Sequence, residues 1–285
     1  MVPVVFALLT ALCNGTASVL QRLAARTAPA SKALHLSLLG YLLRNRVWLA
    51  GVGLIILAAA CQAVALATGP VALVQPIFII ELPFSLLVAS RMMRRRLARM
   101  TWAAVVLVTV SLGAGLAAAA PSGGTGTASG TTWLLTIVVT AAFEAAVIAV
   151  GVRARGNARG AAFGLAAGCG YALTATLMKA AMTALPHGAG PFFGSWQLYG
   201  TAAAGVGSLF LLQNGMQAGL LLAVQPPLTL GDALISSSFG VTVYGETIRA
   251  GGWLAVEILA VLAVAAGIVQ LSRSLAAVHG PEPAR

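Results

Sequence analysis

The chain is poor in charge: only 8% of its 285 residues are Asp, Glu, Lys or Arg, whereas 59% are hydrophobic. A soluble domain of this length could not bury so much apolar surface, so lipid is the expected solvent. Acidic residues are especially scarce, with six against seventeen basic residues and a net charge of +11. This excess does not indicate a nucleic-acid-binding protein, because the basic residues stand between apolar runs and not on one polar domain.

Cysteine and catalytic motifs are also sparse. Cys13, Cys61 and Cys169 all lie inside apolar runs without a CxxC or Cys/His spacing, so neither disulfides nor a zinc site is expected. The sequence contains no HExxH motif, no phosphate-binding loop and no nucleophile elbow in a strand–helix context. The chain is therefore predicted not to be an enzyme and to need no cofactor, and any uphill transport would use an ion gradient or an exchange partner.

Long apolar segments are abundant, and nine of them approach the ~20 residues that a bilayer requires. They predict an all-α polytopic membrane protein with nine transmembrane helices. A shorter piece, 33–43, predicts an interfacial amphipathic helix. The nine spans are expected at 3–25, 47–67, 70–91, 101–120, 132–152, 160–184, 193–213, 218–241 and 252–272.

The basic residues alternate between loops. The first, third and fifth loops carry clusters of Lys and Arg, whereas the second, fourth and sixth carry none and the eighth carries only Arg249. By the positive-inside rule, this pattern predicts a multi-pass protein of the cell membrane with its N-terminus outside and its C-terminus in the cytoplasm. The tryptophans stand near helix starts, as an interfacial aromatic belt would place them: Trp48, Trp102, Trp133, Trp196 and Trp253.

The sequence repeats internally. The segment LVQPIFII (73–80) matches AVQPPLTL (223–230) without a gap at an offset of 150, and Gly69 upstream matches Gly219. Five spans separate each matched pair, so the two halves would have opposite orientations, as in the inverted repeats of many secondary transporters. The predicted divisions are a first repeat at 1–120, a linker plus fifth span at 121–159, a second repeat at 160–273 and a disordered tail at 274–285.

Three segments resemble a known family. The stretch VTVYGETIRAGGWLAVEILAVLAVAAGIV (241–269) looks like the hallmark of the drug/metabolite transporter superfamily, EamA-like: an aromatic, a glutamate, a turn and a final Gly-rich helix. LCNGTASVLQRLAART (12–27) and ALATGPVALVQPI (65–77) are similar to the NIPA branch, which is associated with magnesium transport and has nine spans instead of ten. The chain departs from the family at 94–96, where three arginines replace the glutamate of the first half.

The third span carries an acid and two prolines. Glu81 lies near mid-span, where insertion of a charged residue costs roughly 2.5–3.5 kcal/mol. Pro76 and Pro83 each remove a backbone donor, and broken backbone at membrane depth is tolerated where it lines a cavity or is buried in protein. We expect an interrupted helix beside a binding site that includes Gln75 and Glu81. The alternative is a simple kink with a protonated glutamate bonded to a neighbouring helix.

The eighth span carries a polar stripe. Gln225, Thr229, Asp232 and Ser236 are spaced four, three and four residues apart, which places them on one helical face. The prolines at 226–227 free backbone carbonyls nearby. A stripe with an acid at its centre favours a binding cavity, and the alternative is interhelical hydrogen bonding that only holds helices together.

Other candidates are single residues. Glu144 and Glu257 are either proton carriers or partners of Arg22 and Lys179, two basic residues that are expected to snorkel from their helix ends. Weaker candidates for substrate contact come from the repeat-related first and sixth helices, namely Asn14 and Tyr171.

These features predict an alternating-access carrier that exports a metabolite or amphiphilic solute, with protonation of Glu81, Asp232 or Glu144 coupling transport to the proton gradient. The alternative implied by the NIPA resemblance is a magnesium transporter that uses oxygen ligands from Glu81 and Asp232. A third possibility is a non-transporting scaffold or lipid-handling protein. The expected partners are a small solute, protons or another coupling ion, the lipid bilayer and, as an open possibility, a second copy of the chain.

Overall fold

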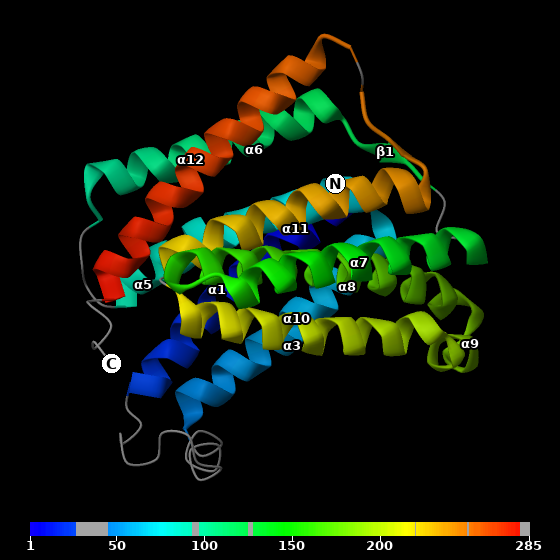
Figure 1. Ribbon diagram of the computed structural model, residues 1–285, viewed down its shortest axis with the longest axis horizontal. Helices are drawn as coiled ribbons and strands as arrows, with labels where there is room; N and C mark the ends of the chain where they lie inside the picture. Colours follow the sequence, from blue (N-terminus) through cyan, green and yellow to red (C-terminus); the bar gives the residue numbers. More distant parts are fainter. Residues whose placement is uncertain (27–44, 93–96, 125–127, 220, 250, 280–285) are drawn as a thin grey trace.

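The computed structural model describes residues 1–26, 45–92, 97–124, 128–219, 221–249 and 251–279, and nearly all of them are helical (Figure 1). The predicted amphipathic helix at 33–43 lies outside these ranges. The helices are α1 (Val2–Arg26), α3 (Arg46–Thr68), α4 (Val71–Ile77), η2 (Phe78–Ile80, 3₁₀), α5 (Glu81–Met92), α6 (Arg99–Ala119), α7 (Gly130–Arg153), α8 (Gly156–Ala184), η3 (Leu185–His187, 3₁₀), α9 (Ala189–Gly194), α10 (Trp196–Ala218), α11 (Leu221–Tyr244) and α12 (Trp253–His279).

In the part of the chain that the structure describes, seven helical segments are long and apolar enough to cross a membrane. The molecule is therefore an all-α, multi-pass membrane protein. The other two predicted spans, 193–213 and 218–241, are also helical and correspond to α10 and α11, of 23 and 24 residues. Their polar residues make them less apolar than the other seven. The seven segments are Val2–Leu20, Arg46–Thr68, Val71–Met92, Arg99–Ala119, Gly130–Arg153, Gly156–His187 and Trp253–Arg273.

The predicted tail and the predicted linker both contain residues of regular structure. The predicted tail begins at residue 274, but α12 continues through His279, because the apolar run LAAV extends the helix beyond Arg273. The Gly/Ser/Thr linker also contributes structure. Ser122–Gly123 forms β1, which pairs antiparallel with β2 (Glu246–Thr247), so this segment ties the end of α6 to the segment after α11.

The helices pack around α8, the most buried of the spanning segments. α8 lies against α7, α10 and α11, while α1 packs against α3 and α5. α6 and α12 pack on each other and form the upper pair in Figure 1, with α11 between this pair and the rest of the bundle. Large apolar side chains on the outward faces of α6, α7, α10 and α12 are exposed, as expected where lipid replaces water.

Glycines bring the central helices into close contact. A Cβ added at Gly164 or Gly168 of α8 would lie 2.5 Å from a backbone carbonyl oxygen of α11, that of Val224 or Leu228. In the first half, a Cβ at Gly15 of α1 would lie 2.9 Å from the carbonyl oxygen of Glu81. Small residues at such crossings allow backbones to approach, which is how helices associate in lipid.

The Gly168→Ala substitution is therefore expected to lower the free energy of unfolding by about 1–3 kcal/mol, because the added methyl group must push α8 and α11 apart. Gly53→Ala in α3 is the matched control, since no atom lies within 4 Å of its added Cβ. That change is expected to stabilise the helix by roughly 0.5–1 kcal/mol. Thermal melting of both variants in the same detergent checks the pair, and equal shifts would contradict the packing described here.

The third span is interrupted, as its prolines predict. It consists of α4, the 3₁₀ turn η2 and α5, and Glu81 is the first residue of α5. Pro83 stands in the first turn of α5, where an amide hydrogen has no intrahelical acceptor and its absence costs little. The eighth span, which also carries two prolines, is not interrupted. Pro226 and Pro227 lie inside α11, which is one continuous helix.

Three helix boundaries recur at an offset of 150 residues. α3 and α10 each have 23 residues, and both their first and their last residues differ by 150 in number. The next helix starts at Val71 in one half and Leu221 in the other, again 150 apart. The connecting residues Gly69 and Gly219 have nearly the same extended conformation, with φ −145° and ψ 167° against φ −141° and ψ 168°.

Candidate functional site

A buried ion pair joins three distant segments of the chain. The Lys179 ammonium of α8 lies 2.7 Å from Oε1 of Glu246, which belongs to β2. The ammonium also donates to the carbonyl oxygen of Gly69 at 3.0 Å, after the end of α3. The predicted snorkelling of Lys179 was wrong, because only 8% of the residue is exposed and its partners all lie inside the protein. Lys179 therefore pairs with neither Glu144 nor Glu257, and the side chain of Arg22 lies outside the described part of the structure.

The Glu246 carboxylate also caps helix α4. It accepts hydrogen bonds from the backbone amides of Val71 at 2.6 Å and Ala72 at 2.9 Å. These amides have no intrahelical acceptor, and the positive end of the helix dipole favours an anion at this position. Gly240 of α11 leaves the space for this carboxylate, since an added Cβ there would collide with Glu246 Oε2. We call Lys179, Glu246 and the start of α4 the α8–β2–α4 lock.

Aromatic rings enclose the lock. The ammonium of Lys179 lies 4.8 Å from the centroid of the Tyr244 ring, and the Tyr244 hydroxyl donates to the carbonyl oxygen of Thr176. Trp133 stacks edge-on against both Trp196 and Tyr244. Trp133 is only 6% exposed, so its ring packs inside the protein. The rings replace water around the ion pair, which strengthens its electrostatic attraction.

The interior acids predicted from the sequence meet between α1, α5, α8 and α11. Glu81 at the start of α5 and Asp232 of α11 lie close enough to interact electrostatically, and the Asn14 side chain is within hydrogen-bonding reach of Glu81. Tyr171 of α8 interacts with both acids. Ser236, which is fully buried, donates to Asp232 Oδ1 at 3.1 Å. We call these five residues the acid cluster.

The remaining predicted residues lie around this cluster or apart from it. Gln225 Nε2 donates to Thr229 Oγ1 at 3.3 Å, so the first part of the α11 stripe bonds to itself. Gln75 is 2% exposed, and its buried Nε2 atom has no hydrogen-bond partner within the described ranges. Glu144 Oε1 lies 2.8 Å from the position of a Cβ on Gly170, at the α7–α8 contact. The structure does not join Glu144 to the acid cluster by a hydrogen bond among the residues it describes.

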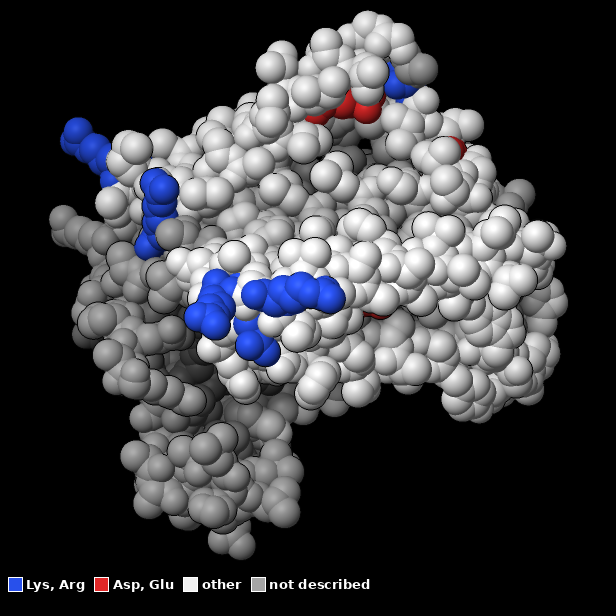
Figure 2. Space-filling view, in the orientation of Figure 1, with Lys and Arg blue, Asp and Glu red and all other residues white. Residues whose placement is uncertain are grey.

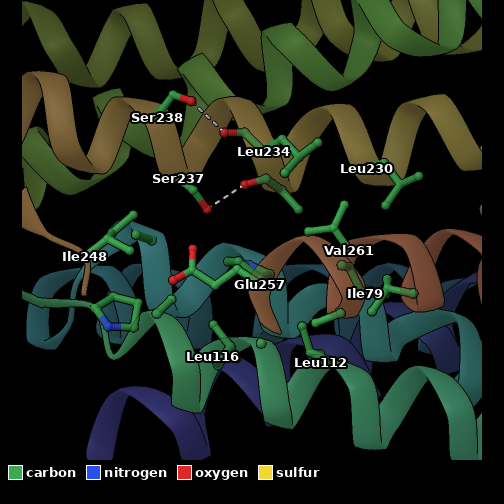
Figure 3. Close-up of a pocket in the computed structure, with 18 of the residues that line it drawn as sticks. Ile79, Leu112, Leu116, Leu230, Leu234, Ser237, Ser238, Ile248, Glu257 and Val261 are labelled. Carbon is green, nitrogen blue, oxygen red and sulfur yellow. Dashed lines mark hydrogen bonds between the residues drawn. The ribbon is translucent and has the colours of Figure 1, made fainter. Parts of the chain in front are cut away.

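A cavity of about 490 Å³ lies on the other side of α11. It is lined by residues of α4, η2, α6, α11 and α12, and it opens to the surface: Figure 2 shows the hollow below the α6–α12 pair with acidic atoms inside it. Residues of α11 that include Ser237, Ser238 and Thr242 line the cavity. They lie on the face of α11 opposite the predicted polar stripe. Glu257 of α12 projects into the same space (Figure 3).

The sequence analysis did not select this face of α11. Its serines and threonine were not among the predicted site residues, whereas Glu257, about one turn inside α12, was a candidate proton carrier. The signal that could have found the cavity is the second polar face of α11, opposite the stripe. Glu246 was also missed as a site residue, although it is the glutamate of the YGET segment that carried the family resemblance.

The described residues contain no group of three or more His, Cys, Asp or Glu side chains that could hold a metal ion. Glu81 and Asp232 provide two carboxyl groups, and further ligands for a cation would have to come from backbone carbonyls, Asn14 or water.

Comparison with known proteins finds a distant relative that covers nearly the whole chain. An uncharacterised protein of Corynebacterium glutamicum is 26% identical over 273 residues, which cover 95% of this chain and 94% of that protein. No family model and no solved structure matches the chain. The similarity extends over almost the full length of both proteins. The resemblance to the drug/metabolite transporter superfamily stays a prediction, because no family model matches the chain.

Proposed function

We propose that the protein is a secondary transporter that moves a small solute by alternating access. The observation that carries the proposal is the acid cluster, in which Glu81 from the first half and Asp232 from the second half interact inside an apolar bundle. A carboxylate at membrane depth costs free energy unless a proton or a cation neutralises it. A pair of such groups at the junction of two halves is suited to binding and releasing a coupling ion, for which we propose the proton.

The proposed architecture is a nine-span inverted repeat. The common offset of 150 residues in the boundaries of α3 and α10 supports it, as does the matching conformation of Gly69 and Gly219. The helix contacts also correspond. α1 packs against α3 and α5, and α8 packs against α10 and α11, while α6 and α12, the fourth and ninth spans, pack on each other. Two halves related in this way can exchange inward-facing and outward-facing conformations.

The proposed orientation has the N-terminus outside and the C-terminus in the cytoplasm, with the protein in the cell membrane. The Lys and Arg side chains visible in Figure 2 lie mainly toward the side where α7 ends, which supports a cytoplasmic assignment for that side. The lock then lies near the opposite, external side, because it joins the end of α8, the start of α4 and β2.

Purified protein in liposomes that contain a pH-sensitive dye tests this proposal. A panel of cationic, neutral and anionic solutes is added against an imposed pH gradient. We expect at least one solute class to drive a proton flux that needs the protein. If no solute moves protons and no labelled solute exchanges across the membrane, while the protein keeps its melting temperature, the transporter proposal is wrong and a scaffold or lipid-handling role is favoured.

Magnesium is the second candidate substrate, because the two interacting carboxyl groups could supply hard oxygen ligands. Liposomes loaded with a magnesium indicator separate the two functions. A magnesium influx that is lost in Glu81→Gln would favour the second candidate, whereas proton-coupled solute flux without magnesium entry supports the first.

A further inference from the structure

The cavity between α11 and α12 has an unusual balance of polar groups. Of the described residues that line it, Glu257 is the charged one, and no Lys, Arg or His is among them. The Oε1 atom of Glu257 is buried and has no hydrogen-bond partner among the residues that the structure describes. A buried hydrogen-bond acceptor without a donor costs free energy. A molecule that enters the cavity could supply the donor that this carboxyl oxygen lacks.

Three of the four hydroxyl groups that line the cavity already donate to backbone carbonyl oxygens, and the fourth, that of Ser111, makes no hydrogen bond to Glu257 Oε1. Ser237 donates to the carbonyl oxygen of Ala233 at 2.7 Å, and Ser238 donates to that of Leu234 at 2.9 Å, as the dashed lines in Figure 3 show. Thr242 donates to the carbonyl oxygen of Ser238 at 2.8 Å. Each of these hydroxyls has used its only hydrogen and offers lone pairs to the cavity. These groups therefore accept hydrogen bonds, and the ligand must supply the donors or the positive charge.

The rest of the lining is apolar. Figure 3 shows Leu112 and Leu116 of α6, Ile79 of η2 and Val261 of α12 facing the same space as Glu257. Cavities of roughly 300–1,000 Å³ with apolar walls and a few polar groups are typical of small-molecule sites. The volume of about 490 Å³ lies in this range. The walls are suited to a hydrocarbon body and the Glu257 end to a cationic head.

We propose that this cavity binds a small amphiphilic monocation, in which an ammonium group pairs with Glu257 and an apolar body lies against α6, η2 and α12. This inference rests on the proposed transport function, for which it names the substrate class. It concerns a different place from the acid cluster, because none of the five cluster residues lines the cavity. A divalent cation fits the cavity poorly, since one carboxylate and apolar walls replace few of its water ligands.

Binding of hexylammonium and of hexan-1-ol to purified protein in a neutral detergent tests the proposal. The two probes share a six-carbon chain and differ in the charge of the head group. We expect the dissociation constant of wild type for hexylammonium to be at least about tenfold lower than that for hexanol. A hydrogen bond to a charged group stabilises a complex enough to produce a ratio of this size. In Glu257→Gln, which keeps the size of the side chain, the preference is expected to disappear.

Glu282→Gln is the matched control, because it removes one acid from the end of the chain and is expected to keep the preference. Val261→Phe is a second variant, which fills part of the cavity without changing charge, and it is expected to weaken both probes alike. Equal preference for hexylammonium in wild type and Glu257→Gln would overturn the proposal, and so would a wild type that binds both probes equally.

This experiment also separates the two proposals. Glu81→Gln is expected to lose proton-coupled flux but to keep the preference for hexylammonium, since Glu81 does not line the cavity. If Glu257→Gln keeps the preference while solute-driven proton flux is present in wild type, the transport proposal stands and the cation site is wrong. If the preference depends on Glu257 but no flux is found with any solute, the site stands without the transport function.

Discussion

Lys179→Met is expected to lower the free energy of unfolding by about 3–5 kcal/mol, the usual cost of leaving one member of a buried ion pair without its partner. The side chain of Glu246 is fully buried, and without the ammonium its negative charge is balanced only by two backbone amides. The carbonyl oxygen of Gly69 loses its donor as well. Chemical or thermal unfolding in detergent, followed by helical circular dichroism, measures the loss.

Arg153→Met is the matched control, because that guanidinium is exposed and bonds only to the carbonyl oxygen of Ala149 in its own helix. Its effect is expected to stay within about 0.5 kcal/mol. The double variant Lys179→Met/Glu246→Gln removes both charges and is expected to be more stable than the sum of the two single variants implies. A Lys179→Met protein that unfolds like wild type would show that the lock contributes little.

Asp232→Asn and Glu81→Gln are expected to abolish proton-coupled uphill transport, reducing it to the level of protein-free liposomes. Neither amide can bind and release a proton in the pH range of the assay, and each change leaves the acid cluster with a single carboxyl group. Exchange of labelled for unlabelled solute needs no net proton movement, so it is expected to persist. Parallel measurements of uphill uptake and exchange, with the same protein in the same liposomes, check the prediction.

Glu282→Gln again serves as control, and it is expected to retain both activities. Uphill transport at wild-type rates in Asp232→Asn and Glu81→Gln would contradict the proposed coupling role of the acid cluster. Loss of both uphill transport and exchange, with an unchanged melting temperature, would instead assign these residues to solute binding.

Most of the helical fold was predictable from the sequence, because membrane spans are dictated by local apolar composition. The interruption of the third span was also predictable, since Pro76 and Pro83 are local signals. In the eighth span the same signal failed. α11 continues through Pro226 and Pro227 as one helix, and Gly164 and Gly168 of α8 lie directly against its backbone at this level.

The lock was not predictable in the same way. Lys179 and Glu246 are 67 residues apart, and Glu246 lies in a polar turn where a glutamate is expected to face water. Only the return of β2 to pair with β1, next to the start of α4, brings this residue into the interior. Long-range pairing of this kind depends on tertiary packing, which neither hydropathy nor helical spacing encodes.

The residues of the acid cluster are all among those predicted from the sequence, and the fold brings them close together, whereas the cavity was not predicted. The stripe through Asp232 was visible because four polar residues share one face. The hydroxyls on the opposite face of α11 looked like residues that bond to their own helix, and Ser237 and Ser238 do so. Their role in shaping a site depends on α12, whose position relative to α11 is a tertiary property.

The most direct test of alternating access is the accessibility of Thr229 from the two sides of the membrane. The three native cysteines are replaced by alanine, and Thr229→Cys is treated with a membrane-impermeant thiol reagent in right-side-out and inside-out vesicles. Val139→Cys, on the lipid-facing side of α7 and 63% exposed in the isolated chain, is the control that should not react. We predict that Thr229→Cys reacts from both sides, in proportions that change with pH; reaction from one side only, at every pH tested, would contradict the account.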